Sequence, residues 1–175
     1  MTLYSLGYPD LNEADDKFIY AYRKEHDVPY RDVVSYHFTL VFGINKIDKD
    51  TYIEHVRRIA RRQKQISFVC RYAMLANDDS NSNYYVFLVP DEGYSQVSLL
   101  HDHLYTGPLK PFHLMDIPYI PHVGIATIPD AQKVKGLCDS LNAKGINISG
   151  ILKHITVCEL KENRIIDLER FEFSN

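Results

Sequence analysis

The feature that most constrains the fold is a stretch, Tyr36–Phe42, in which large apolar side chains occupy every second position. This period of two predicts a β-strand, because successive side chains of a strand point to opposite faces. The apolar face would lie on the core and carry Phe38, Leu40 and Phe42. The opposite face would carry His37, Thr39 and Val41, so that an imidazole and a hydroxyl stand two residues apart.

A second stretch, Ile120–Ala126, has the same outline. Val123 and Ile125 would share its apolar face, while His122 and Gly124 would share the other face. Two such strands lying side by side would bring two histidines into one groove. We therefore expect the function to lie in this groove.

Strand and helix patterns alternate along the rest of the chain. Further strands are predicted over residues 3–8, 66–75, 84–89, 148–160 and 165–173. Helices are predicted over residues 12–26, 94–105 and 130–143, and over about fifteen residues from Asp48 or Asp50. Asn12 and Asp130 are expected to cap their helices, and Gly145 to end the last one. Residues 77–83 predict a turn, and residues 106–118, with three prolines, a loop.

The order of these elements repeats. A strand with a histidine, a helix and two strands follow one another twice, and His37 and His122 lie 85 residues apart. This order predicts an α+β fold from a duplicated unit, with two antiparallel sheets around a central groove and helices outside. We expect one domain over residues 1–175 with two lobes, and a ligand bound between them.

Composition narrows the class of protein. The net charge of −3 gives the molecule no general attraction for nucleic acid, so local groups would have to bind an anion. Cys70, Cys138 and Cys158 lack metal-binding spacing and indicate reduced thiols in a cytoplasmic protein. The sequence shows no secretion signal and no apolar run of membrane length. We expect a monomer without membrane association.

Two histidines on one face suit general acid–base catalysis. One imidazole can take a proton from water while the other gives a proton to the leaving oxygen, as phosphodiester hydrolysis requires. Thr39 would stand about 6–7 Å along the strand from His37 and could donate a hydrogen bond to a phosphoryl oxygen. Neither a metal nor a cofactor is expected. Taken singly, His37 could be a buried core histidine and Thr39 a strand-favouring residue.

These residues carry a resemblance. His37-Phe38-Thr39-Leu40 and Pro121-His122-Val123-Gly124-Ile125 resemble the paired motifs of the two-histidine phosphoesterases, the 2'-5' RNA ligase and cyclic phosphodiesterase superfamily. The resemblance implies a bilobal fold and metal-independent hydrolysis of cyclic or 2'-5' phosphodiester bonds. The partner would be an RNA terminus or a nucleotide. His37, Thr39 and His122 would be catalytic, and Gly124 would contact the substrate.

Gly124 departs from the family pattern, which has threonine or serine there. Its backbone N–H could still face a phosphate, because glycine permits close approach. Loss of one oxyanion donor costs on the order of 10²-fold in rate. Two alternatives therefore stay open: 2'-5' RNA ligation, and binding of a nucleotide or RNA with weakened catalysis.

A third stretch, His154-Ile155-Thr156-Val157, matches the motif letter for letter. Only 21 residues follow His154, too few for a helix and two strands. The duplication also makes this stretch equivalent to residues 66–75. We therefore expect His122 to be the partner of His37.

Three further residues are candidates for substrate contact. Arg71 interrupts an apolar strand, so its cation needs a partner or a groove. Tyr36 and Tyr119 flank the two motifs and could stack on a base, although half-buried packing explains each of them equally well. His101-Asp102-His103 suggests a metal site, but helical residues two apart do not converge. We expect these histidines to be exposed and His113 to lie in a loop.

Overall fold

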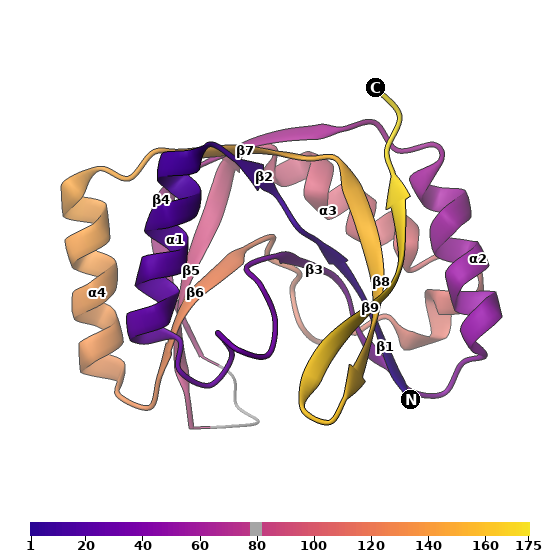
Figure 1. The fold of residues 1–175 in the computed structure, drawn as a ribbon, viewed down its shortest axis with the longest axis horizontal. Coiled ribbons are helices and arrows are strands. Elements are labelled where there is room, and N and C mark those ends of the chain that lie inside the picture. The colour runs from indigo at the N-terminus through magenta and orange to yellow at the C-terminus, as the bar shows by residue number, and fades with distance from the viewer. Residues whose placement is uncertain (78–81) are drawn as a thin grey trace.

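Within residues 1–77 and 82–175, which the computed structural model describes, one curled antiparallel sheet is packed against helices (Figure 1). The strands are β1 (Thr2–Gly7), β2 (Asp10–Leu11), β3 (Phe38–Ile44), β4 (Ile66–Asn77), β5 (Tyr84–Glu92), β6 (Val123–Ile128), β7 (Ile148–Leu152), β8 (His154–Lys161) and β9 (Arg164–Glu172). The helices are α1 (Glu13–His26), α2 (Lys49–Ala60), α3 (Tyr94–Leu104), α4 (Ala131–Lys144) and the short 3-10 helix η1 (Gly107–Phe112).

The sheet runs in the order β2-β7-β4-β5-β6-β3-β1-β8-β9. One residue pair, Phe38 with Val123, joins β6 to β3 in its middle. On one side of this junction lie β6, β5, β4, β7 and β2, and on the other β3, β1, β8 and β9. The α+β class with two antiparallel halves is confirmed, and the two sheets we expected are continuous through this junction.

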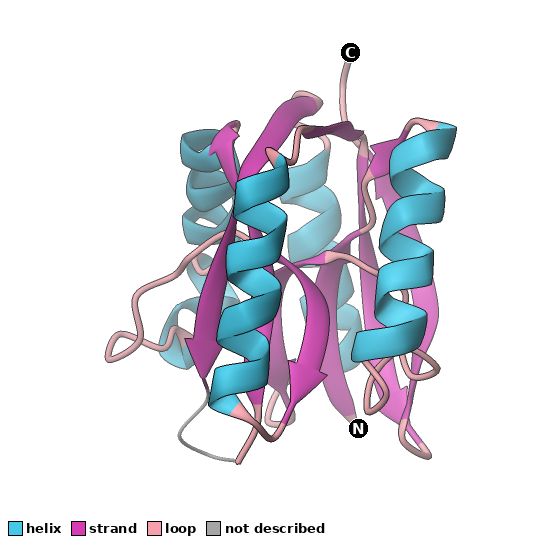
Figure 2. Cartoon of the chain, turned by 90° about the vertical axis from the view of Figure 1, so that its left-hand side faces the viewer, coloured by secondary structure: helices cyan, strands magenta, loops and turns pink. Residues whose placement is uncertain are grey.

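The helices divide between the two halves of the sheet. α1 contacts β6, and α4 contacts β4, β5 and β6, so both cover the first half (Figures 1 and 2). α2 contacts β8 and β9 in the second half, and α3 contacts β3 and β5 near the junction. None of the helices in the described ranges combines the length and apolar character that a membrane crossing requires.

The two repeats exchange strands. β4 and β5 follow the His37 strand in the chain, yet they pair in the half that contains β6. β8 and β9 follow the His122 strand, yet they join the half that contains β3, through β1. Each half of the sheet is therefore built from both parts of the chain.

Side-chain caps define the helix boundaries as expected. The Asn12 side chain accepts hydrogen bonds from the backbone N–H groups of Ala14 and Asp15, each at 3.0 Å. Asp48, and not Asp50, caps α2, and Asp130 caps α4. Gly145 ends α4 with φ of 70°, a left-handed conformation that glycine adopts without penalty.

Three element boundaries differ from the predictions. Lys153 divides the strand predicted over residues 148–160 into β7 and β8, which lie in different halves of the sheet. The loop predicted over residues 106–118 contains η1. His37 and His122 each stand one residue before their strands. Of the turn predicted over residues 77–83, residues 78–81 lie outside the described part of the chain.

The alternation predicted for the His37 strand breaks at Val41. Val41 is fully buried, while Phe42 is only half-buried, so our assignment of these two side chains to the two faces was wrong. The register explains the change: Leu6 pairs with Thr39, but Ser5 pairs with Val41, so β3 carries one extra residue at this point. Such a bulge shifts all following side chains to the other face.

A buried polar network fixes the segment that leads into β3. The Arg23 Nε and the Thr127 hydroxyl both donate to the Asp27 carboxylate, at 2.8 and 2.7 Å. Arg23 also donates to the backbone carbonyl of Val34, at 2.9 Å. Arg23 and Asp27 are 6% and 3% exposed, so neither charge can rely on water. The network thereby connects α1, β6 and the residues just before His37.

We predict that Asp27→Asn destabilises the protein by about 3–5 kcal/mol, because it leaves the buried Arg23 guanidinium without a counter-charge. Urea unfolding would measure this change. Asp139→Asn is the matched control, since Asp139 pairs with Lys135 four residues away on exposed α4, and should cost less than about 0.5 kcal/mol. Equal effects in the two variants would contradict the role assigned to the network.

Candidate active site

The junction between β3 and β6 brings the two histidine motifs together. Because Phe38 pairs with Val123 in antiparallel register, position 37 stands across from 124 and position 39 across from 122. Side chains at opposing positions of two strands point to the same face, with their Cβ atoms about 4.5–5.5 Å apart. His37, Thr39, His122 and Gly124 therefore form one cluster on one face of the sheet.

Both imidazoles are held in the same tautomer. The Nδ1 of His37 lies 2.7 Å from the backbone carbonyl of Ser35, and the Nδ1 of His122 lies 2.7 Å from that of Ile120. A carbonyl oxygen can only accept, so each Nδ1 donates its hydrogen. In the neutral rings, each Nε2 consequently keeps its lone pair. The Thr39 hydroxyl, 3.2 Å from the His37 Nε2, donates to it.

Burial favours the neutral form of both rings. It lowers the pKa of His37 to about 4, and the Arg23 and His122 side chains add to this effect against the opposing hydrogen bond to Ser35. Burial also lowers the pKa of His122, opposed by the hydrogen bond to Ile120. Both residues are nonetheless only half-buried. Both imidazoles are uncharged at neutral pH, because each pKa lies below the ordinary histidine value.

Phe87 of β5 orients the second histidine. Its ring stacks on that of His122 with centroids 3.7 Å apart and planes 14° apart. The same ring lies next to Gly124, where an added Cβ would stand 3.9 and 4.0 Å from two of its carbon atoms. These are ordinary contact distances, so packing at Gly124 leaves room for a serine or threonine.

The two tyrosines that flank the motifs make specific contacts. The Tyr119 hydroxyl donates to the Thr39 backbone carbonyl at 3.0 Å, and its ring stacks on His101 with centroids 3.6 Å apart. Tyr119 thus supports the Thr39 backbone, and one face of its ring is already occupied. The Tyr36 hydroxyl donates to Asp16 at 2.6 Å, and its side chain lines a groove between α1 and β9.

Arg71 lies apart from this cluster. Its guanidinium donates to Asp91 at 2.6 Å and to Glu92 at 2.5 Å, both at the end of the neighbouring strand β5. β5 separates β4, which carries Arg71, from β6. The cation in this strand therefore has partners, as the sequence argument required, and the structure does not place it beside the histidines.

The expectation of an exposed His101 is wrong. His101 is 2% exposed, and its Nδ1 donates to the Leu40 backbone carbonyl at 3.0 Å. His101, Asp102 and His113 each have one potential metal-ligating atom, and these three atoms lie within 4.8 Å of one another. His113 itself ends η1 and stacks on Tyr105. The buried His101 ring thus contacts both Leu40 and Tyr119. Through these contacts it supports the β3 backbone.

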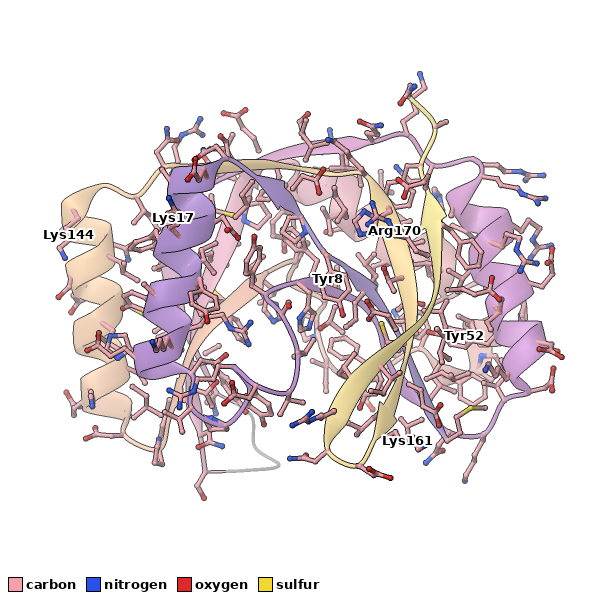
Figure 3. The ribbon with its side chains drawn as sticks, in the orientation of Figure 1. Tyr8, Lys17, Tyr52, Lys144, Lys161 and Arg170 are labelled. Atoms are coloured by element: carbon pink, nitrogen blue, oxygen red, sulfur yellow. The ribbon has the colours of Figure 1, made fainter. Side chains whose placement is uncertain are left out.

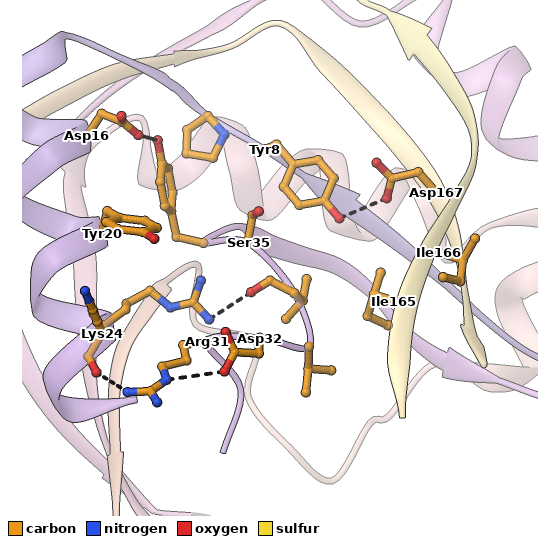
Figure 4. Close-up of a pocket in the computed structure, with 15 residues that line it drawn as sticks. Tyr8, Asp16, Tyr20, Lys24, Arg31, Asp32, Ser35, Ile165, Ile166 and Asp167 are labelled. Carbon is orange, nitrogen blue, oxygen red and sulfur yellow. Dashed lines mark hydrogen bonds and ion pairs between the residues drawn. The ribbon is translucent and has the colours of Figure 1, made fainter. Parts of the chain in front are cut away.

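A groove of about 890 Å³ lies between α1 and β9 (Figure 4). Ser35 and Tyr36, the two residues that precede His37, line it, whereas none of the four motif residues does. Basic, acidic and aromatic side chains line it, among them Tyr8, Asp16, Tyr20, Arg23, Lys24, Arg31, Asp32 and Asp167. Tyrosine rings suit bases and basic groups suit phosphates. Sequence reasoning missed these residues, because they come from α1, its following segment and β9 and share no local motif.

The comparisons agree with this architecture. A family model described as the 2'-5' RNA ligase superfamily matches residues 10–164. E. coli LigT complexed with 3'-AMP is 17% identical with a TM-score of 0.63, and the alignment covers 99% of this chain and 98% of LigT. TT0787 of Thermus thermophilus is 14% identical with a TM-score of 0.61, at 99% and 98% coverage. At these identities the likeness shows the fold. None of the curated proteins compared with the chain matches it.

The matched range contains both histidine strands and the junction between them. It spans most of the 175 residues, and the order of elements and the antiparallel sheet are consistent with it. The chain belongs to the 2'-5' RNA ligase superfamily.

Proposed function

We propose that the protein is a metal-independent phosphodiesterase that acts on cyclic 2',3'-type or 2'-5' phosphodiester bonds of RNA ends or nucleotides. One observation carries this proposal: two imidazoles stand directly before the paired strands β3 and β6, and each has its Nδ1 hydrogen bonded to a backbone carbonyl. This arrangement leaves both Nε2 atoms for proton transfer on one face of the sheet.

The two rings would divide the proton transfers between them. One neutral Nε2 takes a proton from the attacking water, whose oxygen forms a bond to phosphorus. The other ring, protonated, gives its proton to the ribose oxygen as the bond between this oxygen and phosphorus breaks. The product is a phosphate monoester beside a free hydroxyl. After the reaction the first ring is protonated and the second is neutral. Proton exchange with solvent then returns both rings to their starting protonation.

The negative charge of the substrate favours protonation of the acid, and the proton itself comes from solvent. Both imidazoles are otherwise neutral at pH 7, because burial lowers the pKa of each ring. A phosphodiester anion placed between them favours the charged form of one ring. Binding of substrate thus prepares the acid, and the second ring stays available as the base.

The remaining motif residues would hold the phosphoryl oxygens. The Thr39 hydroxyl, which donates to His37, could turn to an oxygen of the substrate. The backbone N–H of Gly124, across from His37, could serve the second oxygen. Arg71 is engaged with two carboxylates, so we do not include it in this site.

The ligands of a related fold support a nucleotide. E. coli LigT has been crystallised with 3'-AMP, with ATP and with phosphate. In this chain the groove between α1 and β9 offers Tyr8, Tyr20 and Tyr36 for base stacking and Lys24 and Arg31 for phosphates. Tyr36 is therefore our candidate for base contact, while Tyr119 is assigned to support of the Thr39 backbone.

Gly124 favours a second possibility. A site without the second hydroxyl could bind nucleotide or RNA ends with slow turnover, or could join ends in a 2'-5' linkage. Analysis of product linkage distinguishes ligation from hydrolysis, and the variants below distinguish slow turnover from binding alone.

We predict that His37→Ala and His122→Ala each lower kcat for adenosine 2',3'-cyclic phosphate by at least about 10²-fold, because each removes one proton transfer. Initial rates in EDTA would measure this loss, and circular dichroism would establish that both variants fold. His113→Ala, which alters a histidine outside the site, should retain the wild-type rate. An active His122→Ala variant would disprove the two-histidine mechanism.

The pH dependence should reflect the lowered pKa values. A productive site needs one neutral and one protonated ring, and the pKa is about 4 for His37 and below the ordinary 6.5 for His122. We therefore expect kcat/KM to fall as the pH drops through about 4, where His37 becomes protonated, and to fall again as rising pH removes the proton from His122, at a pH below the ordinary histidine pKa. EDTA should leave the profile unchanged. A rate that keeps rising above pH 8 would contradict this assignment.

Restoring the second hydroxyl should raise the rate. Gly124→Ser adds a donor across from His37 at a position where a Cβ meets only ordinary contacts. We predict a gain of up to about 10²-fold in kcat, the value of one oxyanion donor. Gly124→Ala is the matched control, because it adds the Cβ without the hydroxyl. The same rate in both variants would show that the missing hydroxyl does not limit turnover.

A further inference from the structure

The third His-x-Thr motif is aligned with the first one across β1. Leu6 of β1 pairs with Thr39 of β3 on one side and with Thr156 of β8 on the other. Tyr8 comes two residues after Leu6. Extending both strand pairings to this position places Tyr8 between His37 and His154. Its ring centroid is 6.2 Å from that of His37 and 6.5 Å from that of His154. β3 and β8 therefore present the same two residue types in the same order, two strands or roughly 10 Å apart.

The second copy of the motif faces a cavity. His154, Thr156 and Arg170 line a space of about 370 Å³, and Arg170 is the residue of β9 that pairs with Thr156. Tyr8 lines this cavity and also the larger groove between α1 and β9, so it forms the wall between them. Figure 3 shows Tyr8 near the centre of the sheet and Arg170 on β9.

One buried polar atom beside this cavity has no hydrogen-bond partner among the described residues. The Nδ1 of His154 has no hydrogen bond there although the residue is only 3% exposed, whereas His37 and His122 each use Nδ1 for a carbonyl. A buried polar atom without a partner is unfavourable unless a ligand or water completes it. Arg170 donates through Nε to Glu172 at 2.7 Å, which leaves its terminal nitrogens available.

The carboxylates nearby are already engaged. Asp10 pairs with Lys153 at 2.8 Å, and Glu169 pairs with Arg57 at 3.0 Å. Asp167 accepts hydrogen bonds from the Tyr8 hydroxyl at 3.1 Å and the Cys158 thiol at 3.3 Å. The neutral donors on Asp167 leave its negative charge in place, so an anion in the cavity would have to bind at the donors of Thr156 and Arg170, away from Asp167.

We propose that His154, Thr156 and Arg170 form a second phosphate subsite, which binds the phosphate one nucleotide away from the bond that is cleaved. This inference rests on the proposed function, because it takes the His37–His122 cluster as the reaction centre. The ribose between the two phosphates would lie over Tyr8. The preferred substrate would then be an oligonucleotide end rather than a cyclic mononucleotide. No second imidazole faces His154 as His122 faces His37 within the described residues, so the subsite binds without reacting.

Substrates that differ by one nucleotide, and therefore by one phosphate group, test this inference. We compare kcat/KM for a diadenosine dinucleotide that ends in a 2',3'-cyclic phosphate with that for adenosine 2',3'-cyclic phosphate. Wild type should prefer the dinucleotide, and Thr156→Val and Arg170→Gln should each lower this preference about tenfold, the loss typical of one good hydrogen bond to a charged group. The loss should appear in KM. Arg164→Gln, at the exposed start of β9, should keep the wild-type preference.

The outcomes separate this inference from the proposed function. Hydrolysis by wild type with the same preference in all variants would overturn the subsite and leave the phosphodiesterase in place. If wild type hydrolyses neither substrate, a titration with inorganic phosphate, followed by the NMR signals of the His154 ring, tests the subsite directly. A phosphate-dependent shift that Arg170→Gln abolishes supports the subsite, and a ring that does not respond overturns it.

Discussion

The pairing of Phe38 with Val123 is the contact on which the rest of the structure depends. It joins two half-sheets that are otherwise separate, and it does so at the residues that follow the two histidines. Because the pair is antiparallel, each histidine stands across from the other motif's third residue. A shift of one residue in this register would turn one histidine to the opposite face of the sheet. The geometry of the site is thus a property of the sheet and not of a flexible loop.

Main-chain groups hold the two imidazoles of this cluster. The Ser35 and Ile120 carbonyls fix which nitrogen of each ring carries hydrogen, and burial favours the neutral form of both rings. These carbonyls belong to the segments just before the strands. The buried pair of Arg23 and Asp27 holds the first segment by its bond to Val34. The position of the His37 ring therefore depends on a charge pair outside the histidine cluster.

Much of the fold could be predicted from local patterns, and what escaped prediction depends on which strands become neighbours. Helix caps at Asn12 and Asp130 follow from short-range hydrogen bonds that the sequence shows directly. The bulge that buries Val41 arises from pairing with β1. The alignment of His154 with His37 likewise requires β1 between them, so the motif could be seen in the sequence but its place could not. Arg71 was a candidate for substrate contact, because its carboxylate partners lie on another strand and could not be identified from the sequence.

Because the two repeats exchange strands, a chain cut between them would give two fragments that each lack strands of their half-sheet. A break in the loop after η1 would leave β1 to β5 in one fragment and β6 to β9 in the other. Neither fragment could complete a half-sheet, because β3 and β1 need β8 and β9, while β4 and β5 need β6 and β7. The fragments would have to recombine in order to fold. By the same geometry, two copies of a single ancestral repeat would meet as an intertwined pair, and fusion of such a pair yields the present connectivity.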